Sequence, residues 1–321
     1  MMKATLRAET DSLPPMAAAT ASVVAPRTLA PSRCADYLEL TKPRIALMAL
    51  FTVAAGYLLA AGNQPDLRIL LHTLVGAGLV AAGGSALNQL FERKIDARMR
   101  RTMKRPLPAG RISPEEAAMF GSALAGAGVA YLAATVPLPA TIAAALTFVL
   151  YAFVYTPLKT RTAWNTLVGA VPGALPPVIG WYAAKGWSGA AGWEGAAILF
   201  AILFFWQIPH FLAIAWMYRR DYADGGLIML PGCDPSGRQT AGVMVLAAAA
   251  LIPLGFVALA VGLGGWLFAL GGAGLSLLFT RRAVEFARCR TDQNARRVLL
   301  ASLLHLPGVL ALFMMDVLLV R

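Results

Sequence analysis

The sequence predicts an all-α polytopic membrane protein with about nine transmembrane helices. Of its 321 residues, 58% are hydrophobic and only 14% are charged, whereas a soluble domain carries about 25% charged residues. Apolar runs long enough to cross a bilayer recur from residue 45 to the end of the chain. The Lys and Arg residues gather in alternate connecting segments, as the positive-inside rule requires. The three cysteines are too few and too far apart for a disulfide scaffold.

The chain divides near residue 36. Residues 1–36 are rich in Ala, Thr, Ser and Pro and contain no long apolar run, so we expect a disordered tail followed by one transmembrane domain over residues 37–321. Each apolar run in that domain should be a helix, because a lone strand leaves its backbone polar groups unsatisfied in lipid. The predicted spans cover residues 45–62, 70–91, 115–134, 138–157, 164–184, 195–217, 240–261, 264–280 and 298–319.

The net charge of +12 follows from the membrane topology and does not require nucleic acid as a partner. The inner loops 92–114, 158–163, 218–239 and 281–297 hold 8, 2, 3 and 6 Lys and Arg, and the N-terminal segment holds six. Only Arg68, Lys185 and Arg321 fall on the outer side. We therefore expect an odd number of spans, a cytoplasmic N-terminus and a periplasmic C-terminus. Because the tail shows no clear transit peptide, we expect a bacterial inner membrane.

Polar residues recur at the inner end of the second span. Asn88, Glu92 and Asp96 follow one another at intervals of four residues, so they lie within about 80° on one helix face. Such oxygens suit a hard cation such as Mg²⁺, which usually takes one or two carboxylates together with substrate phosphates. We call Asn88, Glu92 and Asp96 the first motif. The basic run after it offers candidate phosphate ligands, namely Arg101, Lys104 and Arg105.

A second acidic segment follows the sixth span. Asp221 and Asp224, the second motif, lie three residues apart and face one side of a helix that Gly225 and Gly226 should end. A basic residue, Arg220, precedes them and is a further candidate phosphate ligand. The corresponding end of the fourth span carries two more candidate phosphate ligands, Lys159 and Arg161. Each segment alone is compatible with an ordinary solvated helix end, but two acidic sites four spans apart suggest two halves of one site.

Four stretches of the chain carry a recognisable combination of motifs. The first, 88–111, contains Asn-xxx-Glu-xxx-Asp and Arg-Thr-xx-Arg-Pro. The others are 155–165, 172–181, and 206–231, which begins Trp-Gln-Ile-Pro-His-Phe. Together they resemble the UbiA prenyltransferase superfamily, and within it the haem O synthases. The resemblance implies helices around a central cavity, with a prenyl diphosphate held through Mg²⁺ by both motifs. Two departures stand out: Glu92 replaces the superfamily's usual Asp, and Gly225 shortens the second motif to Asp-xx-Asp.

The resemblance also implies a reaction, in which farnesyl diphosphate donates its farnesyl group to a vinyl group of haem B and water is added. It makes His210, in the sixth span, a candidate haem-binding residue, although a histidine that only packs helices together is an open alternative. Docking to a haem A synthase is left open by the sequence.

Two other functions remain as alternatives. A related enzyme with an aromatic or quinone-precursor acceptor would share the diphosphate site. A transporter would instead need ionisable groups near the middle of its spans. Most acids here lie at inner helix ends, with Asp316 near the outer end of the last span as the exception, so the sequence favours an enzyme.

Overall fold

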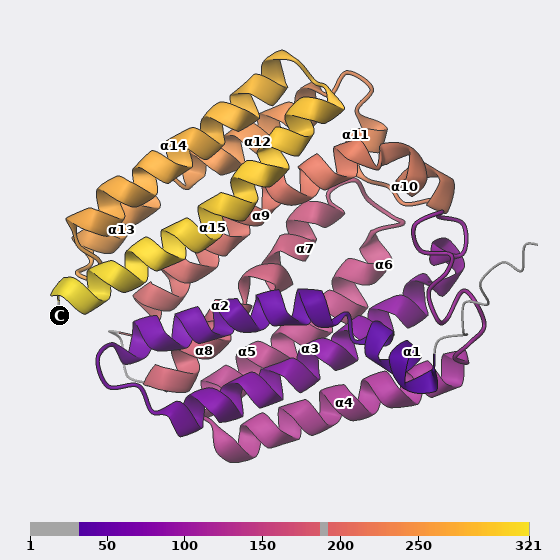
Figure 1. Ribbon diagram of the computed structural model, residues 1–321, viewed down its shortest axis with the longest axis horizontal. Helices are drawn as coiled ribbons and strands as arrows, with labels where there is room; N and C mark the ends of the chain where they lie inside the picture. The colour runs from indigo at the N-terminus through magenta and orange to yellow at the C-terminus, as the bar shows by residue number, and fades with distance from the viewer. Residues whose placement is uncertain (1–31, 187–191, 321) are drawn as a thin grey trace, which may run out of the picture. The chain divides into compact units, whose positions relative to one another are not determined.

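The computed structural model describes residues 32–186 and 192–320, and this part of the chain contains helices and no strands (Figure 1). The helices are α1 Arg33–Leu40, α2 Pro43–Ala61, α3 Leu67–Asp96, α4 Pro114–Thr135, α5 Leu138–Val149, the π-helix η1 Leu150–Tyr155, α6 Thr156–Leu158, α7 Asn165–Ala174, α8 Pro176–Lys185, α9 Trp193–Met217, α10 Arg219–Gly225, α11 Leu230–Cys233, α12 Arg238–Ala250, α13 Leu254–Ala260, α14 Trp266–Arg288 and α15 Asp292–Val320.

The described residues form nine segments long and apolar enough to span a membrane, which confirms the predicted helical class and number. Three of these segments join consecutive helices: α5, η1 and α6 over Leu138–Leu158, α7 and α8 over Asn165–Lys185, and α12 and α13 over Arg238–Ala260. Prolines accompany the breaks at Pro176 and Pro253, because proline lacks the N–H that would continue the helix.

The structure differs from the sequence prediction around residues 281–297. This segment is helical except for the turn at residues 289–291, instead of being an inner loop. Arg281 and Arg282 both pair with Glu285 on the same helix, and such pairs allow a helix to continue beyond the apolar layer. The predicted tail over residues 1–36 lies mostly outside the described residues, and its last four belong to α1.

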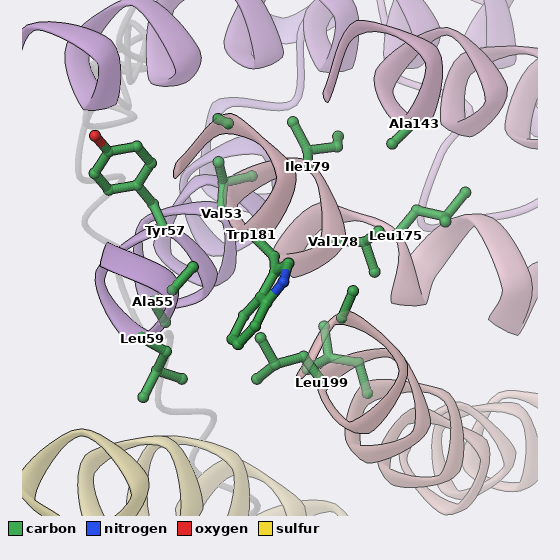
Figure 2. Close-up of a cluster of buried hydrophobic side chains, with 14 of the residues drawn as sticks. Val53, Ala55, Tyr57, Leu59, Ala143, Leu175, Val178, Ile179, Trp181 and Leu199 are labelled. Atoms are coloured by element: carbon green, nitrogen blue, oxygen red, sulfur yellow. The ribbon is translucent and has the colours of Figure 1, made fainter. Parts of the chain in front are cut away.

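The core between α2, α8 and α9 depends on very close backbone contacts. A Cβ atom on Gly180 would lie 1.9 Å from the Val53 carbonyl oxygen, and one on Gly56 would lie 2.1 Å from the Pro177 oxygen. Small residues allow membrane helices to approach in this way. Figure 2 shows Trp181 of α8 filling the space beside this crossing, toward Leu199 of α9. The crossing therefore sets how closely α2 and α8 pack against each other.

One end of the bundle gathers the short helices. In Figure 1, α1, α10 and α11 lie at the end opposite the last turn of α15, close to the loop that follows α3. A Cβ atom on Gly225 of α10 would lie 2.9 Å from the Met99 side chain, so α10 packs directly on that loop. Arg111, also in the loop, donates to Asp36 of α1 at 2.8 Å. These contacts bring both acidic motifs to the same end of the bundle.

Asp316, the acid that stood apart in the sequence, has a structural role at the other end of the bundle. Its carboxylate accepts hydrogen bonds from the backbone N–H groups of Gly265 and Phe268, at the start of α14. A carboxylate at this position satisfies N–H groups that have no partner within the helix and interacts favourably with the helix dipole. Asp316 therefore caps a helix, which removes the main observation in favour of an ion pathway.

Candidate functional site

The first motif lies on one face of α3, and all three of its members are buried. Asn88, Glu92 and Asp96 are 0%, 7% and 1% exposed, although they occupy the last turns of a helix at the membrane boundary. Polar groups of this kind are buried only when they are paired. The helical period that predicted a common face is thus observed, and the burial shows that the face points into the protein.

Two cations from the predicted set pair with the acids of the first motif. Lys159 Nζ donates to Glu92 Oε1 at 2.7 Å, and Arg105 Nη1 donates to Asp96 Oδ2 at 2.7 Å. Lys159 follows α6 and Arg105 lies in the loop after α3, so two separate segments converge on one helix face. Burial acts to lower the pKa of Lys159, but the charge interactions with Tyr155 and Glu92 outweigh burial and raise it. Lys159 therefore stays protonated at neutral pH.

The remaining member of the first motif has a cationic partner that sequence reasoning missed. Lys42 Nζ donates to Asn88 Oδ1 at 2.6 Å, while Asn88 Nδ2 donates to Thr156 Oγ1 at 3.0 Å. Burial lowers the pKa of Lys42 to about 7. A perturbed pKa beside paired acids is a common feature of functional sites. The first motif is therefore matched, residue by residue, with three basic side chains.

The backbone of Lys42 is itself unusual. Its φ and ψ are 49° and 60°, and among the described residues no other non-glycine residue has a positive φ. Side chains other than glycine rarely adopt this left-handed conformation unless the surrounding structure enforces it. The only local signal in the sequence is Pro43, which follows it and begins α2. That dipeptide does not by itself predict a left-handed turn.

The π-helix η1 positions a hydroxyl that bonds to the first motif. In η1 the backbone N–H of Thr156 bonds to the Tyr151 carbonyl, and the Thr156 hydroxyl also donates to that oxygen at 2.8 Å. Thr156 Oγ1 is thereby oriented to accept from Asn88. The Lys159 ammonium, one turn further on, lies 4.6 Å from the centre of the Tyr155 ring. π-Helical turns are rare and frequently occur at functional sites.

The second motif contributes one of its two acids to this arrangement. Asp221 Oδ1 accepts from the backbone N–H of Arg100 at 3.2 Å, which joins α10 to the loop after the first motif. Asp224 is exposed, and the structure gives it no polar partner among the described residues. As expected, Gly226 ends the helix with a φ of 81°. The structure thus joins Asp221 to the loop that follows the first motif and leaves Asp224 at the surface.

The donor set fits a divalent cation completed by a phosphate ligand. Asp96 Oδ1 and Asp221 Oδ2 are buried oxygens without a hydrogen-bond partner, an arrangement that calls for a cation or water. Across residues 32–186 and 192–320, no three His, Cys, Asp or Glu side chains form a metal site on their own. Mg²⁺ does not need such a cage, because it commonly combines one or two carboxylates with substrate phosphates.

The other predicted phosphate ligands are exposed. Arg101 is exposed, with its guanidinium carbon 5.4 Å from the centre of the Tyr218 ring. The side chains of Lys104, Arg161 and Arg220 are also exposed, and within the described residues no ion pair joins them to either motif. Of the six predicted cations, Arg105 and Lys159 therefore reach the buried acids, while four lie at the surface.

His210 lies deeper in the bundle, away from the acids. Its Nδ1 is 2.8 Å from Ser302 Oγ on α15, and its ring stacks on Trp206 with centroids 5.0 Å apart. Trp206 Nε1 in turn donates to the Ser302 carbonyl at 2.7 Å. The contact through Nδ1 fixes the ring, so the arrangement serves helix packing.

Comparison with known proteins agrees with this geometry. The chain matches the UbiA prenyltransferase family over residues 49–306. It is 46% identical to the protoheme IX farnesyltransferase of Solibacter usitatus, covering 88% of this chain and 98% of the relative. It is 45% identical to the enzyme of that name from Salinibacter ruber, with the same coverage. The mitochondrial protoheme IX farnesyltransferase of Arabidopsis thaliana is 43% identical, over 86% of this chain and 63% of the relative.

Solved structures share the fold at low sequence identity. A structure of digeranylgeranylglyceryl phosphate synthase superposes with a TM-score of 0.75 at 18% identity, covering 89% of this chain and 98% of the other. A UbiA homologue from Archaeoglobus fulgidus, bound to GPP and Mg²⁺, superposes with a TM-score of 0.64 at 18% identity, covering 87% and 99%. At these identities the likeness establishes the fold alone.

Proposed function

The chain belongs to the UbiA prenyltransferase family, and from that membership we propose that it farnesylates haem B to give haem O. The farnesyl group comes from farnesyl diphosphate and is attached to a haem vinyl group. The observation that supports this most strongly is the first motif, buried and paired with Lys42, Arg105 and Lys159 at the membrane boundary. The names of relatives that are 43–46% identical over most of this chain support haem as the acceptor.

Glu92, Asp96 and Asp221 would hold Mg²⁺ in this proposal, with Asn88 beside them. For Asp96 and Asp221 the support is a buried carboxylate oxygen without a hydrogen-bond partner, and for Glu92 it is its place on the same face of α3. When bound, the ion supplies a Lewis acid that offsets negative charge on the departing diphosphate. Asp224, the exposed acid of the second motif, would join the metal–diphosphate site from the surface side.

The chain's own cations have two tasks in the transfer. The bond between the first farnesyl carbon and diphosphate breaks, a carbon–carbon bond forms to the vinyl group, and water adds to the other vinyl carbon with release of a proton. Lys159 and Arg105 stabilise the charge that develops on the leaving diphosphate and require no proton transfer. The exposed side chains of Arg101, Lys104, Arg161 and Arg220 would attract the anionic substrate toward this end of the bundle. The apolar spans around the site would shield an allylic cation from stray water.

His210 would position the haem through Nε2. The hydrogen bond between Nδ1 and Ser302 fixes the orientation of the ring, and stacking on Trp206 reinforces it. An aromatic or quinone-precursor acceptor is the second candidate, because the diphosphate site would serve it equally well. Docking to a haem A synthase would allow the product to pass directly to the next enzyme, and it remains part of the proposal.

The protein is a multi-pass membrane protein, and we propose the bacterial inner membrane with the acidic motifs on the cytoplasmic side. The one-sided distribution of Lys and Arg supports this orientation. In this orientation the N-terminus is cytoplasmic and the C-terminus periplasmic, so the soluble diphosphate substrate meets the site from the cytoplasm.

The direct test is an assay of purified protein in detergent with haem B, farnesyl diphosphate and Mg²⁺, followed by mass spectrometry of the haem. Farnesylated haem should appear, and it should disappear with EDTA and in Asp96→Ala. Lys94→Ala is the matched control, because Lys94 is an exposed residue on the same helix end. Mg²⁺-dependent binding of farnesyl diphosphate without modified haem would refute haem as the acceptor.

A further inference from the structure

The hairpin of α14 and α15 carries basic side chains that take no part in the proposed reaction. Residues 281–297 hold six arginines and two acids, which gives them a formal net charge of +4. We propose that this hairpin binds an anionic phospholipid, with the lipid phosphate on Arg281, Arg288 and Arg296 and the acyl chains along leucines of the same two helices. The inference goes beyond the proposed function and does not depend on which acceptor is farnesylated.

The positive charge of the hairpin is not neutralised within the described chain. Glu285 pairs with two arginines one turn before it on α14, and Asp292 pairs with Arg219 at 2.7 Å, so both acids already have partners. The side chains of Arg288 and Arg296 are exposed, and no ion pair or hydrogen bond joins them to other described residues. A guanidinium group of this kind can donate two parallel hydrogen bonds to a phosphate group. The hairpin therefore has cations available to an anionic ligand.

On α14, exposed leucines and arginines share one face. Leu270 and Leu277 are 59% and 56% exposed, and they lie seven residues apart. Arg281 and Arg288 continue this line at intervals of four and seven residues, so all four side chains project within about 40° around the helix axis. The Arg281 side chain is 72% exposed. Its ion pair with Glu285 is consequently weak, and a phosphate group can replace it.

On α15 the same order of side chains recurs. Arg296, Leu300 and Leu304 follow one another at intervals of four residues, which places them within about 80° on one face. Leu300 and Leu304 are 51% and 76% exposed, and Arg296 is exposed as well. Both helices thus present an apolar face to the lipid that ends in arginine at the inner end of the bundle.

The packing of the two helices brings their arginines to similar depths. Figure 1 shows α14 and α15 running side by side along one edge of the bundle. Ser276 Oγ is 3.0 Å from His305 Nε2, so these two residues are about level. Five residues further along α14 lies Arg281, and five residues back along α15 lies Leu300, which makes these two level as well. Arg296 lies one turn beyond, or about 6 Å along the axis.

The order of these side chains matches a phospholipid better than a soluble anion. A phospholipid places its phosphate at the membrane surface and its acyl chains directly below, as the arginines and leucines are placed here. A soluble anion would use the arginines alone. The long stem of arginine can lie along the apolar surface while its guanidinium group reaches the phosphate. Basic clusters directly beyond membrane spans attract anionic lipids in this way.

The test is native mass spectrometry of the purified full chain in detergent, with phosphatidylglycerol and phosphatidylcholine of identical acyl chains added in equal amounts. In the parent chain, bound phosphatidylglycerol should exceed bound phosphatidylcholine by about tenfold. The triple variant Arg281→Gln, Arg288→Gln and Arg296→Gln should lower this preference by about tenfold, so that the two lipids bind almost equally.

A second triple variant controls for the loss of net charge. Lys94→Gln, Arg98→Gln and Arg238→Gln remove three exposed cations from the predicted inner loops 92–114 and 218–239. This control should keep the preference of the parent chain, because it leaves the hairpin intact.

Three results would overturn the inference. The first is equal binding of the two lipids by the parent chain, and the second is an equal loss of preference in both triple variants, which would show that only net charge matters. The third is displacement of phosphatidylglycerol by glycerol 1-phosphate at the same concentration, which would show that the leucines contribute nothing. Should the hairpin triple variant fail to fold, Arg296→Gln alone replaces it, since that side chain has no described partner to lose. It should lower the preference several-fold, and an unchanged preference would contradict the proposal.

Discussion

Replacing Lys159 by methionine should destabilise the protein, and the structure sets the size of the loss. The Lys159 and Glu92 side chains are 16% and 9% exposed, with Nζ and Oε1 2.7 Å apart. Removing one member of a buried pair costs about 3–5 kcal/mol of unfolding free energy, because the other charge stays desolvated. The charge of Lys42 also acts on Glu92 and offsets part of this loss. We therefore expect Lys159→Met to cost roughly 2–3 kcal/mol.

The assay is unfolding in mixed micelles with increasing sodium dodecyl sulfate, followed by circular dichroism. Lys94→Met serves as the control, because it removes an exposed lysine from the same end of α3 as Glu92. The double variant Lys159→Met with Glu92→Gln should be more stable than Lys159→Met alone, since it no longer buries an unpaired carboxylate. A cost for Lys159→Met equal to that of the control, or a double variant equal to the sum of the single changes, would refute the reasoning.

The remaining predictions concern four separate parts of the molecule. Asp96→Asn should reduce product formation by about 10²- to 10³-fold while the circular dichroism spectrum stays that of the parent. Asp316→Ala should cost about 1–2 kcal/mol of unfolding free energy, because it removes the cap of α14, with the Michaelis constants for both substrates unchanged. Gly180→Ala should destabilise by about 1–3 kcal/mol, since its Cβ would meet a backbone carbonyl of α2. Gly126→Ala, which meets nothing within 4 Å, should be neutral or stabilising. His210→Ala should raise the Michaelis constant for haem about tenfold or more, as expected on losing about 1.4 kcal/mol of binding, with farnesyl diphosphate binding unaltered in titration.

The sequence predicted the helices and the face of the first motif because both follow from short-range rules. Hydropathy and the need to satisfy backbone groups in lipid determine where the helices lie. Their ends were less predictable: α14 extends to Arg288, because Glu285 pairs with basic neighbours on its own helix. The spacing of Asn88, Glu92 and Asp96 placed them on one face, and a period of 3.6 residues fixes that result without tertiary information.

The missing parts of the site depend on contacts between distant segments. The turn at Lys42 is held by Gln89, 47 positions later in the chain, and nothing in the local pattern encodes it. The contact between Asp221 and the backbone of Arg100 spans 121 positions. Among the predicted cations, only the fold decides that Arg105 turns inward and Arg161 does not. The sequence shows which basic residues are candidate phosphate ligands, but only the tertiary structure shows which of them contact the buried acids.

The π-helix η1 affects how the gene can change over generations. Its hydrogen bond from Thr156 back to Tyr151 accommodates one residue more than an α-helical turn. Losing a single codon between residues 150 and 155 would leave the span long enough to cross the bilayer and would hardly alter its hydropathy. Because the lost residue is the extra one of the π-turn, the helix would close into an α-helical turn and keep the direction of the residues that follow. What would be lost is the wide turn in which the Thr156 N–H and hydroxyl both bond to the Tyr151 carbonyl. A one-residue deletion here should therefore disturb the contact between Thr156 and Asn88 and leave the rest of the span in place.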